Sequence, residues 1–134
     1  MALTMRQLLR NTPLDRHERA DQVRIVKLKY GMHRVKKIPV AACESYSVEV
    51  RNRKPQTFKY VTSIEFYPKK AVKVSCSCAD FMYRFEYALW KAGAADLKYS
   101  NGEPPTTTNP PQLAALCKHT VKLYSTLVAK KLVS

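Results

Sequence analysis

Glycine is scarce in this sequence, with three among 134 residues. The chain therefore has no Gly-rich loop of the kind that binds nucleotide phosphates, and it shows no pair of carboxylates suited to acid–base chemistry. The enzymatic interpretation that remains is a Cys–His nucleophile. These absences favour a protein that is not an enzyme and has no small-molecule substrate.

Long hydrophobic runs are also missing. No apolar stretch approaches the roughly 18 residues that a membrane-spanning helix requires. Polar residues interrupt the N-terminal segment MALTMRQLLRNTPLD too often for a signal peptide. We therefore expect a cytoplasmic protein with no membrane partner. In that compartment the four cysteines stay reduced and free to bind metal.

Acidic residues are few: 10 Asp and Glu stand against 24 Lys and Arg, a formal net charge of +14. Residues 1–75 hold 17 of the basic and 6 of the acidic side chains, so the front half carries most of the excess. Such a charge indicates an anionic partner, and nucleic acid is the first candidate. A chain that lies beside DNA or acidic subunits in an assembly would show the same balance.

The length of 134 residues suits a single domain, 1–134. Its parts are predicted to be a helical N-terminal arm (1–21), a basic β-meander (22–75), and a zinc-binding part (76–134) with a Pro-rich insertion (94–112). Apolar residues that alternate with basic ones predict a first strand over 22–31, ended by Gly31. Three further strands are predicted over 45–53, 56–68 and 70–78, with 33–40 as a loop or a poor edge strand.

The segment from Ala79 to Ala92 predicts a helix, with Asp80 as its cap and Gly93 as its end. One face is apolar, with Phe81, Phe85, Ala88 and Leu89 at helical spacing. An aromatic stripe formed by Tyr83, Tyr87 and Trp90 lies roughly opposite. It either packs under the following loop or offers a surface to bases or to a partner.

Two cysteine-containing pairs predict a metal site. Residues two apart in a strand point the same way, so Cys76 and Cys78 can face one ion. Positions two apart on a helix diverge, so Cys117 must precede a final helix that begins near Lys118, with His119 in its first turn. Three thiolates and one imidazole fill a tetrahedral structural Zn²⁺ site. Cys43 has no partner at metal spacing and is expected to be a buried thiol.

The fold class that follows is α+β: an antiparallel four-stranded sheet followed by two helices joined through a zinc site. Because Cys117 and His119 are used as ligands, no Cys–His nucleophile is left. Strands, then C-x-C at a strand end, a helix, and C-K-H opening another helix resemble the SWIM-type zinc finger, whose pattern is C-x-C…C-x-H. That resemblance covers roughly residues 60–127 and implies binding of DNA or of protein.

The block CSCADFMYRFEYALWKAG…YSNGEPPTTTNP…CKH also resembles small proteins of tailed bacteriophages. That resemblance implies a second function, a structural or assembly subunit of a tailed-phage virion that docks on other subunits or on packaged DNA. The chain would then occupy the host cytoplasm or the virion.

Nine basic side chains of the front half are the candidates for nucleic-acid contact. They lie in strands and turns that a meander would bring onto adjacent surfaces: Arg24, Lys27, Lys29, Arg34, Lys36, Lys37, Arg51, Arg53 and Lys54. Each alone is an ordinary solvated charge, but together they favour contact with phosphates. No recognition-helix signature is present, so we expect sequence-independent binding, with DNA as the preferred partner.

Overall fold

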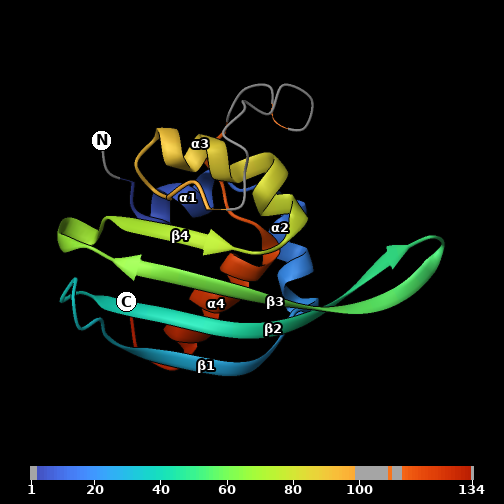
Figure 1. Cartoon of the computed structure of the whole chain (residues 1–134), viewed down its shortest axis with the longest axis horizontal. Helices are drawn as coiled ribbons and strands as arrows, with labels where there is room; N and C mark the ends of the chain where they lie inside the picture. Colours follow the sequence, from blue (N-terminus) through green and yellow to red (C-terminus); the bar gives the residue numbers. More distant parts are fainter. Residues whose placement is uncertain (1–2, 99–108, 110–112, 134) are drawn as a thin grey trace.

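The computed structural model describes residues 3–98, 109 and 113–133. Its centre is an antiparallel sheet with the strand order β1-β2-β3-β4 (Figure 1). The strands are β1 (Arg24–Met32), β2 (Pro39–Arg51), β3 (Lys54–Phe66) and β4 (Val72–Cys76). The predicted α+β class and the predicted four-stranded meander are therefore confirmed. Most of the Pro-rich insertion predicted over 94–112 lies outside the described residues.

Strand β2 begins six residues before the predicted start at Ser45. Val40 pairs with Gly31 on one side and with Glu65 on the other, so two neighbours hold this segment in the sheet. Pro39 is the first residue of the strand, where a missing N–H is tolerated. The loop predicted over 33–40 is therefore shorter, and Gly31 lies within β1 instead of ending it.

Two short helices precede the sheet, within the helical N-terminal arm predicted over 1–21. Helix α1 (Met5–Asn11) begins with a capping box between Thr4 and Gln7, and α2 (Leu14–Arg19) runs on into a 3₁₀ turn, η1 (Ala20–Gln22). Leu8 is fully buried. Backbone N–H of Leu116 donates to Thr12 Oγ1 at 2.9 Å, so this segment is fastened to the chain just before the last helix.

The helix predicted after the second cysteine is present but not uniform. It opens with a π-helical turn, η3 (Phe81–Phe85), and continues as α3 (Glu86–Lys91). Gly93, at φ 81°, ends it as predicted. The expected cap at Asp80 is wrong: its side chain makes no capping hydrogen bond, because the carboxylate is bound by Arg16 instead.

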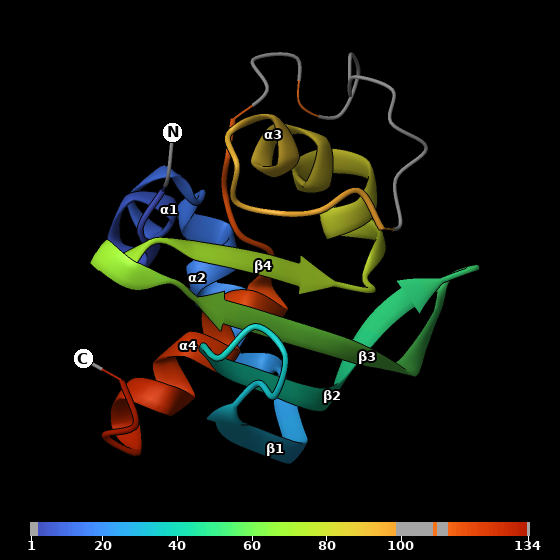
Figure 2. The same ribbon diagram turned by 60° about the vertical axis from the view of Figure 1, so that its left-hand side comes forward.

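The last helix, α4 (Lys118–Ala129), starts at the residue expected from the ligand spacing. It lies across one face of the sheet, while α1, α2 and α3 gather towards the β4 side (Figures 1 and 2). Side chains of β2 that face inward are small, namely Ala41, Cys43, Ser45 and Ser47, all of them buried. They leave room for α4, whose Leu123 and Leu127 are fully buried. Among the described residues, no helix is both long and apolar enough to cross a membrane.

Candidate metal centre

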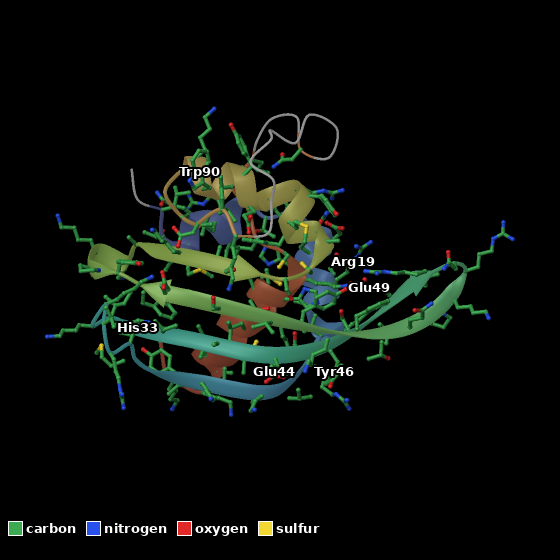
Figure 3. All side chains as sticks on the ribbon, viewed as in Figure 1. Arg19, His33, Glu44, Tyr46, Glu49 and Trp90 are labelled. Carbon is green, nitrogen blue, oxygen red and sulfur yellow. The ribbon has the colours of Figure 1, made fainter. Side chains whose placement is uncertain are left out.

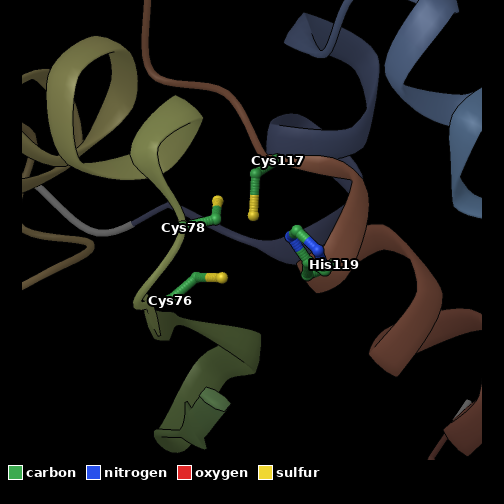
Figure 4. A group of neighbouring side chains, drawn as sticks. All are labelled: Cys76, Cys78, Cys117 and His119. Atoms are coloured by element: carbon green, nitrogen blue, oxygen red, sulfur yellow. The ribbon is translucent and has the colours of Figure 1, made fainter. Parts of the chain in front are cut away.

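Four side chains from two distant stretches converge at the edge of the core. Cys76, Cys78, Cys117 and His119 are all buried, and their ligand atoms lie within 4.8 Å of one another. Figure 4 shows the three sulfurs and the imidazole turned toward a common centre. Two ligand atoms about 2.3 Å from one tetrahedral ion would be about 3.8 Å apart, so small adjustments suffice to close around an ion. The predicted convergence is confirmed, and the group could hold a metal ion such as zinc.

The first pair of ligands is placed by the end of β4. Cys76 is the last residue of the strand, opposite Thr62 of β3. Ser77 turns the other way, and its Oγ accepts a hydrogen bond from the backbone N–H of Val61 at 3.0 Å. Cys78 therefore returns to the side of Cys76, as the period of two in a strand predicts.

The second pair is placed by the start of α4. Cys117 is the N-cap residue and has extended backbone angles, φ −80° and ψ 166°, whereas His119 lies in the first helical turn. This change of conformation brings together two side chains that a continuous helix would hold about 200° apart.

Each sulfur also has a hydrogen-bonding neighbour. Thr62 Oγ1 donates to Cys76 Sγ at 3.4 Å, and the backbone N–H of Phe81 donates to Cys78 Sγ at 3.3 Å. Thr120 Oγ1 lies 3.4 Å from Cys117 Sγ. Donors of this kind stabilise thiolates and orient metal ligands. Thr62 and Thr120 were not predicted from the sequence, although a threonine three residues after Cys117 at a helix start is a usable signal.

Contacts with Ser47 and Tyr60 hold the imidazole of His119 in place. Nε2 lies 3.0 Å from Ser47 Oγ, and the ring of Tyr60 lies against the imidazole with a centroid distance of 4.6 Å. Nδ1 is buried and has no hydrogen-bond partner among the described residues. A buried, unpartnered ring nitrogen is costly unless it binds something. With Nε2 held by Ser47, Nδ1 is the atom available to an ion.

Proximity and burial control the ionisation of the three thiols. Hydrogen bonds with Cys117 and Cys76, and then burial, raise the pKa of Cys78, while burial raises the pKa of Cys76. Burial opposes ionisation of Cys117 too, but the neighbouring side chains of Cys76, Cys78 and His119 lower its pKa below the usual value. Burial and mutual proximity thus oppose the simultaneous ionisation of all three thiols, and a cation at the centre would favour it.

A polar cleft of about 610 Å³ adjoins the centre, and Cys78 and His119 reach its wall. Arg19 and Glu49 also line it, and both are labelled in Figure 3. Lys118 Nζ lies 3.9 Å from Glu49 on this side. Two of the four candidate ligands thus line this cleft, whereas Cys76 and Cys117 do not.

In the wall of the same cleft, buried Arg16 joins helix α2 to the segment that follows Cys78. Its Nη2 and Nε bind the two carboxylate oxygens of Asp80 at 2.7 and 3.2 Å. This bidentate pair holds the segment after the first ligand pair against the N-terminal helices.

All nine basic residues predicted to contact nucleic acid are exposed. The structure does not gather them into one patch. Arg24, Lys27 and Lys29 lie along β1; Arg34, Lys36 and Lys37 lie in the turn between β1 and β2; Arg51, Arg53 and Lys54 lie at the opposite end of the sheet, at the β2–β3 turn. Some are engaged locally: Lys36 Nζ binds Glu65 Oε2 at 2.7 Å, and Lys27 Nζ lies 3.7 Å from Glu44.

The aromatic stripe lies on the outer side of the η3–α3 helix. Tyr83 is 65% exposed and Trp90 is 44% exposed, with the Tyr87 and Trp90 ring centroids 5.6 Å apart. The opposite face, with Phe81, Phe85, Ala88 and Leu89, is buried, as the helical spacing predicts. Trp90 projects away from the sheet in Figure 3. Cys43 is a buried thiol, as expected.

Comparison with known proteins gave no match: no protein-family model, no curated protein and no solved structure matches this chain. The arrangement of the four ligand residues and of the charges therefore carries the functional argument.

Proposed function

We propose that the Cys3His group binds one structural zinc ion. The observation that carries this is the state of His119, whose Nε2 is held by Ser47 while its buried Nδ1 is left for a ligand. Three sulfurs and one nitrogen suit zinc better than a hard cation such as magnesium or calcium. The protein supplies all four ligands, which leaves no coordination position for a substrate, so the proposed role is structural and not catalytic.

The order of the ligands supports a zinc site of the SWIM type. Cys76-x-Cys78 at a strand end and Cys117-x-His119 at a helix start follow the C-x-C…C-x-H pattern. The 38 residues between the pairs form a longer spacer than that pattern usually has. Loop-closure entropy grows only slowly with length, so the spacer is compatible with a metal-closed loop.

For the whole chain we propose a non-catalytic, zinc-stabilised basic protein that binds nucleic acid through its phosphates. Support comes from the net charge of +14 and from the exposure of all nine candidate basic side chains. Their spread over the length of the sheet fits contact with an extended polyanion. Among the described residues no recognition helix is present.

Salt dependence tests this proposal. Fluorescence anisotropy with a labelled duplex of about 20 base pairs should show log K falling linearly with log [salt], at about −0.9 per neutralised phosphate. We expect a slope steeper than about −3, because more than three cations are exposed. Weak binding even at low ionic strength would contradict the proposal.

An alternative function is that of a structural or assembly subunit of a tailed-phage virion. The exposed Tyr83 and Trp90 favour it, because large exposed aromatic side chains are typical of protein interfaces. If the chain is phage-encoded, mass spectrometry of purified particles should detect it at a fixed copy number. Its absence from the particles would remove this alternative.

A further inference from the structure

The β2–β3 hairpin continues beyond the rest of the sheet as a two-stranded ribbon. Pairing of β1 with β2 reaches only to Tyr46, and pairing of β4 with β3 reaches only to Thr62. From Ser47↔Phe58 to Arg51↔Lys54, the two strands pair only with each other, over five residue pairs. At about 3.3 Å per residue the ribbon is about 16 Å long. Figure 1 shows it extending past the helices and the other strands.

The base of this ribbon rests on the metal centre. Ser47, in the first pair of the ribbon, contacts Nε2 of His119 through its Oγ at 3.0 Å. Tyr60, two residues past Phe58 on the other strand, packs on the same imidazole ring. Both strands are therefore attached to His119 where they leave the body.

Cations are concentrated at the far end. Arg51, Arg53 and Lys54 are exposed, against one carboxylate, Glu49, which lies 3.2 Å from Arg51. The guanidinium of Arg51 lies over the ring of Phe58, which is in the first pair of the ribbon, at 4.0 Å, so this cation points back along the ribbon while Arg53 and Lys54 mark the tip. In the part of the chain that the structure describes, no carboxylate lies within ion-pair distance of Arg53 or Lys54. Nitrogen-tipped side chains stand out from this end in Figure 3.

Apolar side chains on the ribbon also face water. Val48 is 59% exposed and Val50 is 72% exposed, and both lie on the face opposite Arg51. A two-stranded ribbon is only marginally stable alone in water. Cations at the tip and valines along one face together fit a partner that offers both phosphates and apolar groups. The major groove of DNA does so, since thymine methyl groups line it between two phosphate backbones.

We propose that this ribbon is an arm that enters the major groove of duplex DNA; the proposal rests on the nucleic-acid binding proposed above. Two strands about 4.8 Å apart with their side chains span about 10–12 Å, which matches a major groove about 12 Å wide and exceeds a minor groove about 6 Å wide. The major groove of duplex RNA is too narrow to admit it. The groove is about 8.5 Å deep, so a ribbon about 16 Å long reaches its floor.

The backbone conformation of the β2–β3 turn allows the proposed arm to be tested with a substitution that suits the turn. Asn52 and Arg53 have φ angles of 53° and 63°, the pattern of a type I′ turn in which glycine is favoured at the second position. Arg53→Gly therefore removes a charge and suits the turn. Combined with Arg51→Gln and Lys54→Gln, it gives an arm variant with three fewer charges.

A matched control lies away from the hairpin. Lys69 and Lys70 of the β3–β4 turn and Lys131 beyond α4 also have positive φ angles, 63°, 65° and 59°, so Lys69→Gly, Lys70→Gly and Lys131→Gly remove the same charge from residues outside the nine candidates. Zinc content and far-ultraviolet circular dichroism should equal the wild type in both variants. The two proteins then differ only in where the cations were removed.

Affinity for a DNA duplex decides the outcome. We expect the affinity of the arm variant for the duplex to be at least about 30-fold lower than that of the wild type. Its salt slope should fall by about 2.7, which corresponds to three contacts at about 0.9 each. The affinity of the control variant should stay within about threefold of the wild type. An equal or greater loss of affinity in the control variant would overturn the proposal that the ribbon is a DNA-binding arm, but not the proposal that the protein binds nucleic acid. Unchanged DNA affinity in the arm variant would also overturn the proposed arm and would indicate that the hairpin contacts a protein instead. Absence of wild-type binding at low salt would remove the proposed function itself.

Entry of the ribbon into the major groove can be tested separately, by comparing DNA and RNA duplexes. An RNA duplex of the same sequence should bind the wild type at least about tenfold more weakly than DNA, and the arm variant should lose this preference. Equal wild-type affinity for the two duplexes would overturn groove entry.

Discussion

Ser47 Oγ lies 3.0 Å from Nε2 of His119, across 72 residues of sequence, and both side chains are buried. The contact engages Nε2, and Nδ1 is the ring nitrogen that has no hydrogen-bond partner among the described residues. It also joins the β2–β3 hairpin to the candidate metal centre. A serine on the inner face of a strand thus links the hairpin to the four candidate ligands.

Ser47→Ala should therefore weaken zinc binding by about 10- to 100-fold, the usual effect of losing such an outer contact. Competition with a chromophoric chelator measures it. Ser45→Ala is the matched control, since Ser45 is equally buried on the same face of β2 and its Oγ has no hydrogen-bond partner among the described residues. Equal weakening in the two variants would show that the Ser47–His119 contact has no special role.

Cys78→Ser should abolish stoichiometric zinc binding, because a closed site loses one of its four ligands. Elemental analysis should give one zinc per chain for the wild type and close to none for the variant, whose thermal unfolding should become broad. Cys43→Ala removes another buried cysteine that is not in the cluster and should retain the zinc. Zinc loss from the Cys43 variant alone would refute the assigned ligand set.

Zinc affinity should rise with pH. The pKa values of Cys78 and Cys76 are raised and that of Cys117 is lowered, so an ion must displace the protons of the first two thiols. About two protons per zinc should be released near neutral pH. Acidification should release the metal and with it the stability that the metal contributes. A pH indicator in weakly buffered solution measures the protons, and affinity independent of pH would contradict this assignment.

The buried thiol of Cys43 provides the control for that titration. Burial raises its pKa to about 11, so it stays protonated throughout the neutral range. Cys43→Ala should leave the number of released protons unchanged.

Arg16→Lys should destabilise the fold by about 1–3 kcal/mol, because lysine cannot make the bidentate contact with partly exposed Asp80. Urea denaturation of the zinc-loaded protein measures the change. Arg19→Lys is the comparison, since Arg19 is 60% exposed and lies 3.9 Å from Asp15, and it should have an effect near zero. Similar losses in both variants would mean that the Arg16–Asp80 pair is not the cause.

Local sequence patterns were sufficient to predict the helices, the strands and the four candidate metal ligands. Alternation of apolar and basic residues over 22–31 and the β-type runs that follow it predicted the sheet, and the helical spacing of Phe81 and Phe85 predicted the buried helix face. The C-x-H pair even located the start of α4, since its side chains can converge only where the backbone changes conformation. These features depend on residues close in sequence.

Long-range contacts could not be predicted in the same way. The early start of β2 at Pro39 depends on pairing with strands on both sides, which overrides the local preference of a proline. Asp80 suits a helix cap, yet it binds Arg16, 64 residues away. Ser47 and Thr62 look like ordinary strand residues until the fold brings them to the ligands.

The placement of the ligands along the chain has a consequence for synthesis on the ribosome. Cys76 and Cys78 are made before the 38 residues that separate them from Cys117. An incomplete polypeptide that stops ahead of Cys117 has only two of the four candidate ligands, Cys76 and Cys78, and can hold an ion only weakly. Tight zinc retention would thus mark a finished molecule, and the sheet would gain its metal-fixed hairpin base only when the C-terminal helix has been translated.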